Sequence, residues 1–231
     1  MTSPVAVFGA SGQTGRLVVD RLLEAGHSVI AVARTVGGRW SGSARVRSST
    51  IDLARVTLAE LTQLVEGVGA IVFAAGGDPE RVDRDGAIRV IEAAEHAGVP
   101  RFVLLTGMGV GRARPASLYG GFWDVYFGAK EASERRLRLS TLAWTILQPG
   151  ELLPSPGTGR VTIAATGTLP IGAISRDDVA AVIAATLESS ATAGHTWELV
   201  GGNDPIRDAV DQAARGAGTS LRSAPEDPLV S

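Results

Sequence analysis

The stretch Gly9-Ala10-Ser11-Gly12-Gln13-Thr14-Gly15 decides the fold of this chain. It follows a short apolar run, Val5 to Phe8, and precedes an amphipathic pattern made by Val18, Val19, Leu22 and Leu23 and ended by Gly26. Glycines spaced three apart between a strand and a helix allow a tight turn, a backbone that another group can approach, and close packing of helix on strand. The stretch therefore predicts a strand, a bare turn and a helix in direct succession.

The pattern of an apolar run followed by a helical stripe repeats along the chain. Further runs without polar alternation, typical of strands buried on both faces, lie at Val29–Val32, Ile71–Ala74, Phe102–Leu105 and Trp144–Leu147. A second stripe, Ala87, Ile88, Ile91 and Ala94, ends before Gly98, and we also expect a strand at Arg45–Ile51 and a helix at Leu58–Val65. Alternating strands and helices predict an α/β protein with a doubly wound parallel sheet, the Rossmann fold.

The length of 231 residues fits one enlarged domain better than two. We expect a single domain over residues 1–215, which includes a small C-terminal lobe on the substrate side from about residue 151. Within it a helix should run from about Ser175 to Leu187, and we interpret Ser175 and Asp178 as its capping arrangement. Residues 216–231 carry few large apolar side chains and should form a flexible tail.

The composition excludes several classes of function. Hydrophobic residues make up 45% of the chain, charged residues 20%, and the formal net charge is -2, so no basic stripe is available for nucleic acid. There is no cysteine, and His27, His96 and His195 are far apart, which argues against disulfides and a metal centre. No apolar run is long enough to cross a bilayer and no leader pattern is visible, so we expect a cytoplasmic protein with no membrane partner.

The glycine turn also predicts a ligand. Exposed N–H groups at a helix start, with the positive end of the helix dipole, bind phosphate. We therefore predict a dinucleotide site whose turn residues are Gly9, Ser11, Gly12, Gln13, Thr14 and Gly15; the alternative is a plain glycine-rich turn.

The end of the second strand bears on the choice of cofactor. It reads Ala33-Arg34-Thr35, without the acidic residue that binds the adenosine ribose hydroxyls in NAD-preferring proteins. A guanidinium suits a 2′-phosphate, so Arg34 favours NADP(H), with NAD(H) as the second choice. Arg34 could instead be a solvated loop residue, with Arg16 or Arg39 in its role.

At this point the sequence resembles the atypical short-chain dehydrogenase/reductase family, in its NAD(P)-binding, epimerase/dehydratase-like branch related to nitrogen-metabolite-repressor-like proteins and flavin reductases. The resemblance spans about residues 4 to 208 and rests on the glycine turn, Asp52-Leu53, Ala74-Ala75-Gly76, Tyr126 with Lys130, Thr145 to Gly150, and Ile174 to Ala180. It implies that Asp52 and Leu53 lie along the adenine and that Ala74, Ala75 and Gly76 lie near the ribose and phosphates. It also implies that Pro149 and Gly150 lie near the nicotinamide, although Gln148 stands where relatives usually carry Arg.

Tyr126 and Lys130 are the candidate catalytic pair. Residues four apart on a helix share a face, and a nearby ammonium favours the phenolate form of a tyrosine. The pair resembles the family's catalytic Tyr and Lys, which implies that Tyr126 exchanges a proton with a carbonyl oxygen while Lys130 also binds the nicotinamide ribose. Relatives place Ser or Thr just after the fifth strand, where this chain reads Thr106-Gly107-Met108, so Thr106 is the remaining candidate hydroxyl.

An aromatic cluster precedes Lys130 and comprises Tyr119, Phe122, Trp123, Tyr126 and Phe127. It either lines the site of an apolar, cyclic substrate or forms a subunit interface, and Tyr126 could simply pack within it.

These observations leave three candidate functions: an NADP(H)-dependent oxidoreductase acting on a carbonyl of a small molecule, an epimerase or dehydratase that retains its cofactor, or a non-catalytic sensor of NADP(H). The expected partner is a small-molecule substrate, and the expected state is a monomer or homodimer.

Overall fold

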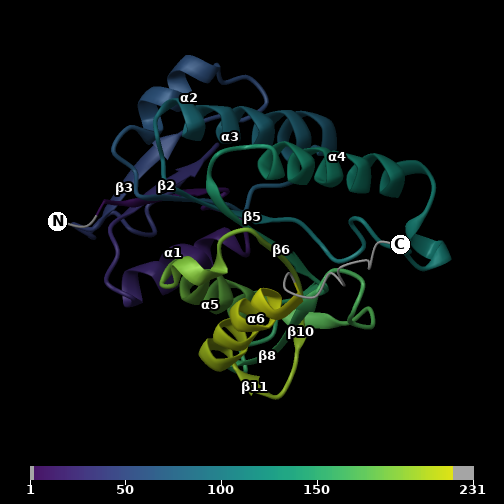
Figure 1. The fold of residues 1–231 in the computed structure, drawn as a ribbon. Helices are drawn as coiled ribbons and strands as arrows, with labels where there is room; N and C mark the ends of the chain where they lie inside the picture. Colours follow the sequence, from purple (N-terminus) through teal and green to yellow (C-terminus); the bar gives the residue numbers. More distant parts are fainter. Residues whose placement is uncertain (1–2, 221–231) are drawn as a thin grey trace, which may run out of the picture.

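The apolar runs form the centre of one twisted sheet in the computed structural model, which describes residues 3–220 (Figure 1). The strand order is β11-β8-β10-β6-β5-β4-β1-β2-β3. Their bounds are β1 Val5–Phe8, β2 Val29–Ala33, β3 Val46–Thr50, β4 Ala70–Phe73, β5 Arg101–Leu105, β6 Ala143–Pro149, β8 Arg160–Ala165, β10 His195–Gly201 and β11 Asp204–Pro205. Neighbouring strands are parallel except that β8 runs antiparallel to β10 and β11.

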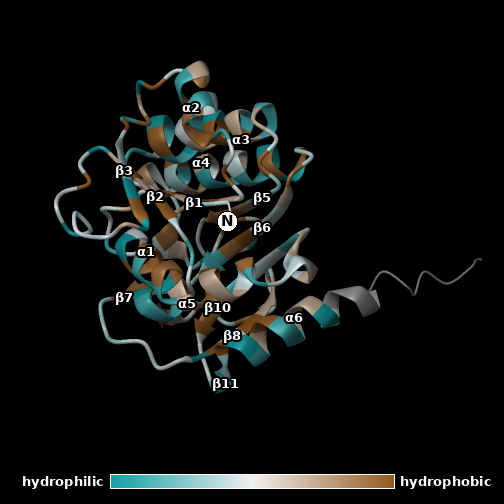
Figure 2. Cartoon of the chain, turned by 90° about the vertical axis from the view of Figure 1, so that its left-hand side faces the viewer, coloured by the Kyte–Doolittle hydropathy of each residue, from teal (hydrophilic) through white to brown (hydrophobic). Residues whose placement is uncertain are grey.

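Two layers of helices cover the sheet, as Figure 1 shows. The first contains α1 Gly15–Glu24, α5 Arg176–Leu187 and α6 Ile206–Ser220, and the second contains α2 Leu58–Val65, α3 Ala87–His96 and α4 Gly121–Arg138. Each layer buries its own apolar core against the strands, and Figure 2 shows the hydrophobic positions concentrated between them. The doubly wound Rossmann fold is therefore confirmed.

The topology places one crevice above the centre of the sheet. From β1 the chain moves outward to β2 and β3, and then returns to β4 on the other side of β1. Phe8 at the end of β1 pairs with Val32 of β2 and Phe73 of β4, so the turn at Gly9 leaves the sheet between these two strand ends. This reversal point at the carboxyl ends of the strands is where ligands bind in such sheets.

The part after Gly150 continues the same sheet. It contributes β8, β10 and β11, and it adds a separate two-stranded sheet of β7 Glu151–Leu153 and β9 Ala173–Ser175. The helix α6 continues to Ser220, so residues 216–220, which we expected in the tail, are helical. The rest of the expected tail, residues 221–231, lies outside the described residues. No helix within residues 3–220 has the length and apolarity needed to span a bilayer.

Three short helical segments complete the fold: η1 Pro79–Gly86, η2 Ala116–Leu118 and η3 Ser190–Thr192. The first is a π-helix that leads directly into α3 and was not predicted, because its sequence is rich in charge and has no apolar stripe. Asp78 caps it by accepting a hydrogen bond of 3.0 Å from the Arg81 amide, and Pro79 occupies its first turn. This segment carries the buried side chain of Asp83.

Candidate functional site

The glycine turn has the geometry that its sequence predicted. Gly9 has φ of +85°, and a Cβ there would lie 2.6 Å from the Ala75 Cα. A Cβ on Gly15 would collide with the carbonyl oxygen of Gly9. Side chains are therefore excluded at both ends of the turn, which lets α1 begin directly against the ends of β1 and β4.

The start of α1 presents free backbone donors. The Gly12 amide donates to Gly9 O at 2.9 Å, and the Arg16 amide donates to Gly12 O at 3.1 Å. Across residues 3–220, no protein acceptor pairs with the amides of Gln13 and Thr14. Such amides at the positive end of a helix suit a phosphate group.

A cavity of about 630 Å³ opens over this turn, within the range of roughly 300–1,000 Å³ usual for small-molecule and cofactor sites. Its lining includes eleven of the predicted cofactor residues, namely Gly9, Ser11, Gly12, Gln13, Thr14, Arg34, Asp52, Leu53, Ala74, Ala75 and Gly76. The glycine turn lets a ligand approach its backbone closely. The free amides and the guanidinium groups on the rim can donate hydrogen bonds to phosphate oxygens, so the cavity fits a dinucleotide. The other four cofactor candidates, Gly15, Lys130, Pro149 and Gly150, do not belong to this lining.

Arg34 lies exposed on the rim of the cavity at the end of β2. Neither Arg16 nor Arg39 contributes to the lining. The guanidinium of Arg39 donates to Asp20 at 2.6 Å, and this hydrogen bond raises the pKa of Arg39. Of the three arginines considered from the sequence, Arg34 is therefore the one that faces the cavity.

Several lining residues were missed by the sequence analysis because the loops that carry them have no periodic pattern. Arg55 follows β3, and Gly77, Asp78, Arg81 and Val82 follow β4. Arg176, at the start of α5, was missed because Ser175 to Asp178 was interpreted as a capping run only. Proximity to Asp52 and Gly76 in the sequence could have indicated the first two groups, whereas only the fold reveals Arg176.

The Tyr126 hydroxyl points to the end of β5. A Cβ built on Gly107 would lie 3.6 Å from Tyr126 Oη. The half-buried ring of Tyr126 also packs on the aromatic cluster, with centroid distances of 5.9 Å to Phe122 and 5.2 Å to Phe127. Tyr126 is thus part of the cluster while its hydroxyl remains next to a residue without a side chain.

Lys130 forms a buried ion pair that sequence reasoning did not find. Its Nζ lies 2.5 Å from Asp83 Oδ1, and the two side chains are 7% and 1% exposed. The other carboxylate oxygen of Asp83 accepts a hydrogen bond of 3.1 Å from the Gly77 amide. Lys130 Nζ is also 5.7 Å from the centroid of the Tyr126 ring. Because Asp83 contacts both Lys130 and Gly77, it connects the helix that carries Tyr126 to the turn that lines the cavity.

The structure does not support Thr106 as the hydroxyl partner of Tyr126. Thr106 Oγ1 donates to the buried Glu134 at 2.5 Å, and Glu134 also accepts from Gln148 Nε2 at 2.9 Å and from Arg138 at 2.7 Å. The residue next to Tyr126 Oη is Gly107 instead. The same network gives Gln148 a structural role, because its side-chain amide donates a hydrogen bond to the Glu134 carboxylate.

Pro149 and Gly150 lie at the end of β6. Pro149 O accepts a hydrogen bond of 2.7 Å from the Met108 amide, and the Gly150 amide donates to Leu199 O at 2.9 Å. Pro149 therefore adjoins the loop that contains Gly107, whereas Gly150 is bonded to β10. Residues 3–220 contain no group of three or more His, Asp or Glu side chains arranged to hold a metal ion.

Comparison with known proteins agrees with this geometry. A family described as NAD(P)H-binding matches residues 9–190. The "Uncharacterized sugar epimerase YhfK" of Bacillus subtilis is 32% identical over 214 residues, covering 89% of this chain and 98% of that protein. The (4-alkanoyl-5-oxo-2,5-dihydrofuran-3-yl)methyl phosphate reductase of Streptomyces griseus is 30% identical over 229 residues, covering 94% of this chain and 75% of the reductase.

A solved structure is similar over nearly the whole chain. It is a Bacillus halodurans protein described as a candidate NAD-dependent epimerase/dehydratase, with a TM-score of 0.80 and 29% identity, and the match covers 91% of this chain and 100% of the other. The family match includes the glycine turn, every residue of the cavity lining except Phe8, and the Tyr126–Lys130 segment. The chain belongs to the NAD(P)H-binding family of Rossmann-fold proteins whose relatives are named epimerases and reductases.

Proposed function

We propose that this protein is an NADP(H)-dependent oxidoreductase that transfers a hydride to or from a carbonyl of a small, apolar, cyclic substrate. The observation that carries the proposal is a cavity that combines the glycine turn with Arg34 on its rim. NADP(H), when bound, supplies or accepts the hydride. The free amides of Gln13 and Thr14 would hold its phosphates, and Arg34 would bind the 2′-phosphate.

The residues around Gly107 supply the proton chemistry. A Cβ on Gly107 would lie 3.6 Å from Tyr126 Oη, so the hydroxyl faces backbone without a side chain. A carbonyl oxygen placed there would receive the proton of Tyr126, or return one in the reverse direction. Lys130 and Asp83 together keep this part of α4 fixed against the turn after β4. Phe122 and Trp123, which are 59% and 37% exposed, offer an apolar surface next to Tyr126 for a cyclic substrate.

A second candidate function is an epimerase or dehydratase that returns the hydride to the same molecule. The name of the B. subtilis relative, a sugar epimerase, favours it, whereas the name of the S. griseus relative favours a reductase. A third, the non-catalytic sensor of NADP(H), is favoured by the engagement of Thr106 with Glu134. Cofactor that stays bound through purification would favour the epimerase, and NADPH consumption with an added carbonyl compound would favour the reductase.

The test of the chemistry is Tyr126→Phe. We expect NADPH affinity to stay nearly unchanged and turnover to fall by about 10²–10⁴-fold, the usual contribution of a positioned acid. Turnover is measured as the loss of NADPH absorbance with a panel of cyclic ketones and enones. The chain offers a matched control in Tyr119→Phe, because Tyr119 is the other of its two tyrosines and its hydroxyl accepts from the Arg114 amide at 3.1 Å. An unchanged rate in Tyr126→Phe would remove Tyr126 from the mechanism.

The test of cofactor choice is Arg34→Ala. Loss of a charge-assisted bond to the 2′-phosphate should weaken NADPH by roughly 10–100-fold, since such bonds contribute about 1.5–3 kcal/mol. NADH, which lacks that phosphate, should bind as before. Arg39→Ala serves as the control, because Arg39 is paired with Asp20 outside the cavity. Equal losses of affinity for NADPH and NADH in Arg34→Ala would show that Arg34 does not bind the 2′-phosphate.

A further inference from the structure

Arg176 is distinct among the residues that line the cavity. Every other lining residue lies between Phe8 and Val82, whereas Arg176 is the first residue of α5, in the C-terminal half of the chain. It is half-buried, in contrast to the exposed Arg34, Arg55 and Arg81 on the same cavity. Within the described part of the chain, its guanidinium has no hydrogen-bond or ion-pair partner. The structure thus holds a partly buried cation against the cavity without a protein counter-charge.

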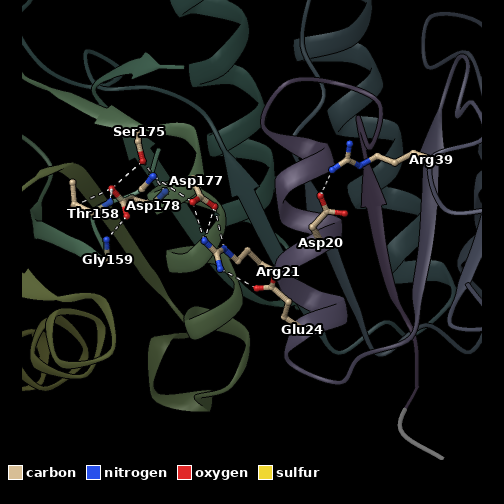
Figure 3. A network of polar contacts seen from close by, with 10 residues as sticks. Asp20, Arg21, Glu24, Arg39, Thr158, Gly159, Ser175, Asp177 and Asp178 are labelled. Carbon is tan, nitrogen blue, oxygen red and sulfur yellow. Dashed lines mark hydrogen bonds and ion pairs between the residues drawn. The ribbon is translucent and has the colours of Figure 1, made fainter. Parts of the chain in front are cut away.

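A network of polar contacts fixes the start of α5 (Figure 3). Ser175 Oγ caps the helix by accepting a hydrogen bond of 2.9 Å from the Asp178 amide. The Asp178 carboxylate in turn accepts from the Thr158 amide at 2.9 Å and the Gly159 amide at 2.8 Å. Since Asp178 is occupied in this way, it is not available to pair with Arg176, and the helix start is held in one position.

The adjacent acid, Asp177, is occupied as well. Arg21 of α1 donates to both of its carboxylate oxygens at 2.8 Å, as Figure 3 shows. This bidentate pair fastens α5 to α1, the helix that begins at the glycine turn. Arg176 therefore enters the cavity from the α1 side, whereas Arg34, Arg55 and Arg81 enter it from the loops after β2, β3 and β4.

We propose that Arg176 binds the diphosphate of the nucleotide cofactor, an inference that rests on the proposed function. The diphosphate belongs over the start of α1, where the free amides of Gln13 and Thr14 lie. Arg176 lines the same cavity as those amides, and a guanidinium can bond two phosphate oxygens at once. Arg176 thereby completes the site from the C-terminal half of the chain, on a helix start that is already fixed by contacts within the protein.

The experiment is isothermal titration calorimetry of Arg176→Ala with three ligands: NADPH, ADP and adenosine 2′-monophosphate. NADPH and ADP contain the diphosphate, and we expect their affinities to fall by at least about tenfold, the effect of one charge-assisted bond of ~1.4 kcal/mol or more. Adenosine 2′-monophosphate lacks the diphosphate and should bind as it does to the unaltered protein. Arg176→Lys should recover only part of the affinity, because lysine keeps the positive charge but cannot donate two parallel hydrogen bonds as the guanidinium does.

Arg47→Ala is the matched control, since Arg47 is an exposed arginine of β3 outside the cavity lining. Unchanged NADPH affinity in Arg176→Ala would overturn the inference and leave the proposed function standing. An equal loss for adenosine 2′-monophosphate would also overturn it, because Arg176 would then contact the adenosine end. If the unaltered protein bound no nicotinamide nucleotide, the proposed function would fail together with the inference. The inference is supported if only the Arg176 variants lose affinity, and if they lose it only for the ligands that contain a diphosphate.

Discussion

At the scale of single residues, the buried pair of Asp83 and Lys130 connects the catalytic candidates to the cavity. Asp83→Asn would leave the ammonium buried without a counter-charge, and breaking a buried pair in this way costs about 3–5 kcal/mol. We therefore expect the free energy of unfolding, measured by urea denaturation, to fall by that amount. The exposed pair of Arg84 and Glu80, at 3.4 Å, provides the comparison: Glu80→Gln should change stability by no more than about 1 kcal/mol.

The double variant Asp83→Asn with Lys130→Met separates loss of the charge pair from loss of packing. It removes both charges and should recover most of the stability that the single variant loses, because no uncompensated ion remains. A double variant as unstable as Asp83→Asn alone would contradict the assigned cause.

The position of single residues was predictable from the sequence where it depends on local structure. The glycine turn and Arg34 follow directly from a strand end and a helix start, and both line one cavity, while their roles in cofactor binding stay predictions. Thr106 and Asp83 depend on contacts between distant segments: Thr106 bonds to Glu134 of α4, and Asp83 pairs with Lys130 of the same helix. No periodic pattern encodes such contacts, so the sequence alone indicated neither the bond of Thr106 to Glu134 nor the pairing of Asp83 with Lys130.

At the scale of elements, the close approach of α1 to β1 depends on Gly15. A Cβ there would collide with the carbonyl oxygen of Gly9, so Gly15→Ala must move the helix start away from the strand. We expect a loss of about 1–3 kcal/mol in unfolding free energy, typical of overpacking, together with weaker nucleotide binding measured by calorimetry. Gly38→Ala is the control, because the nearest atom to its new Cβ is Ser41 Oγ at 3.9 Å. Equal effects of the two substitutions would contradict this account of the turn.

Elements with clear start and stop signals were predicted well. The helix Leu58–Val65 has its predicted bounds and begins with a capping box of Thr57 and Glu60, in which the hydrogen bond from the Thr57 hydroxyl lowers the pKa of Glu60. The η1 segment escaped prediction because its fixed position comes from the Asp78 cap and the buried Asp83, and not from an apolar stripe.

At the scale of the whole molecule, the alternation of strands and helices was sufficient to predict a doubly wound sheet. It did not reveal that the chain after Gly150 returns to extend that sheet with β8, β10 and β11. These strands are short or partly exposed, so they lack the uninterrupted apolar runs that marked the central ones. The same part of the chain contributes α5, which brings Arg176 to the cavity and Asp177 to Arg21 of α1.

The measurement that tests the central claim most directly is isothermal titration calorimetry of the unaltered protein with NADPH, NADP⁺, NADH and NAD⁺. The cavity over the glycine turn, with its free amides and Arg34, predicts saturable binding of NADPH and NADP⁺ with one site per chain, and weaker binding of NADH and NAD⁺. Absence of binding heat for all four nucleotides at millimolar concentration would contradict the account.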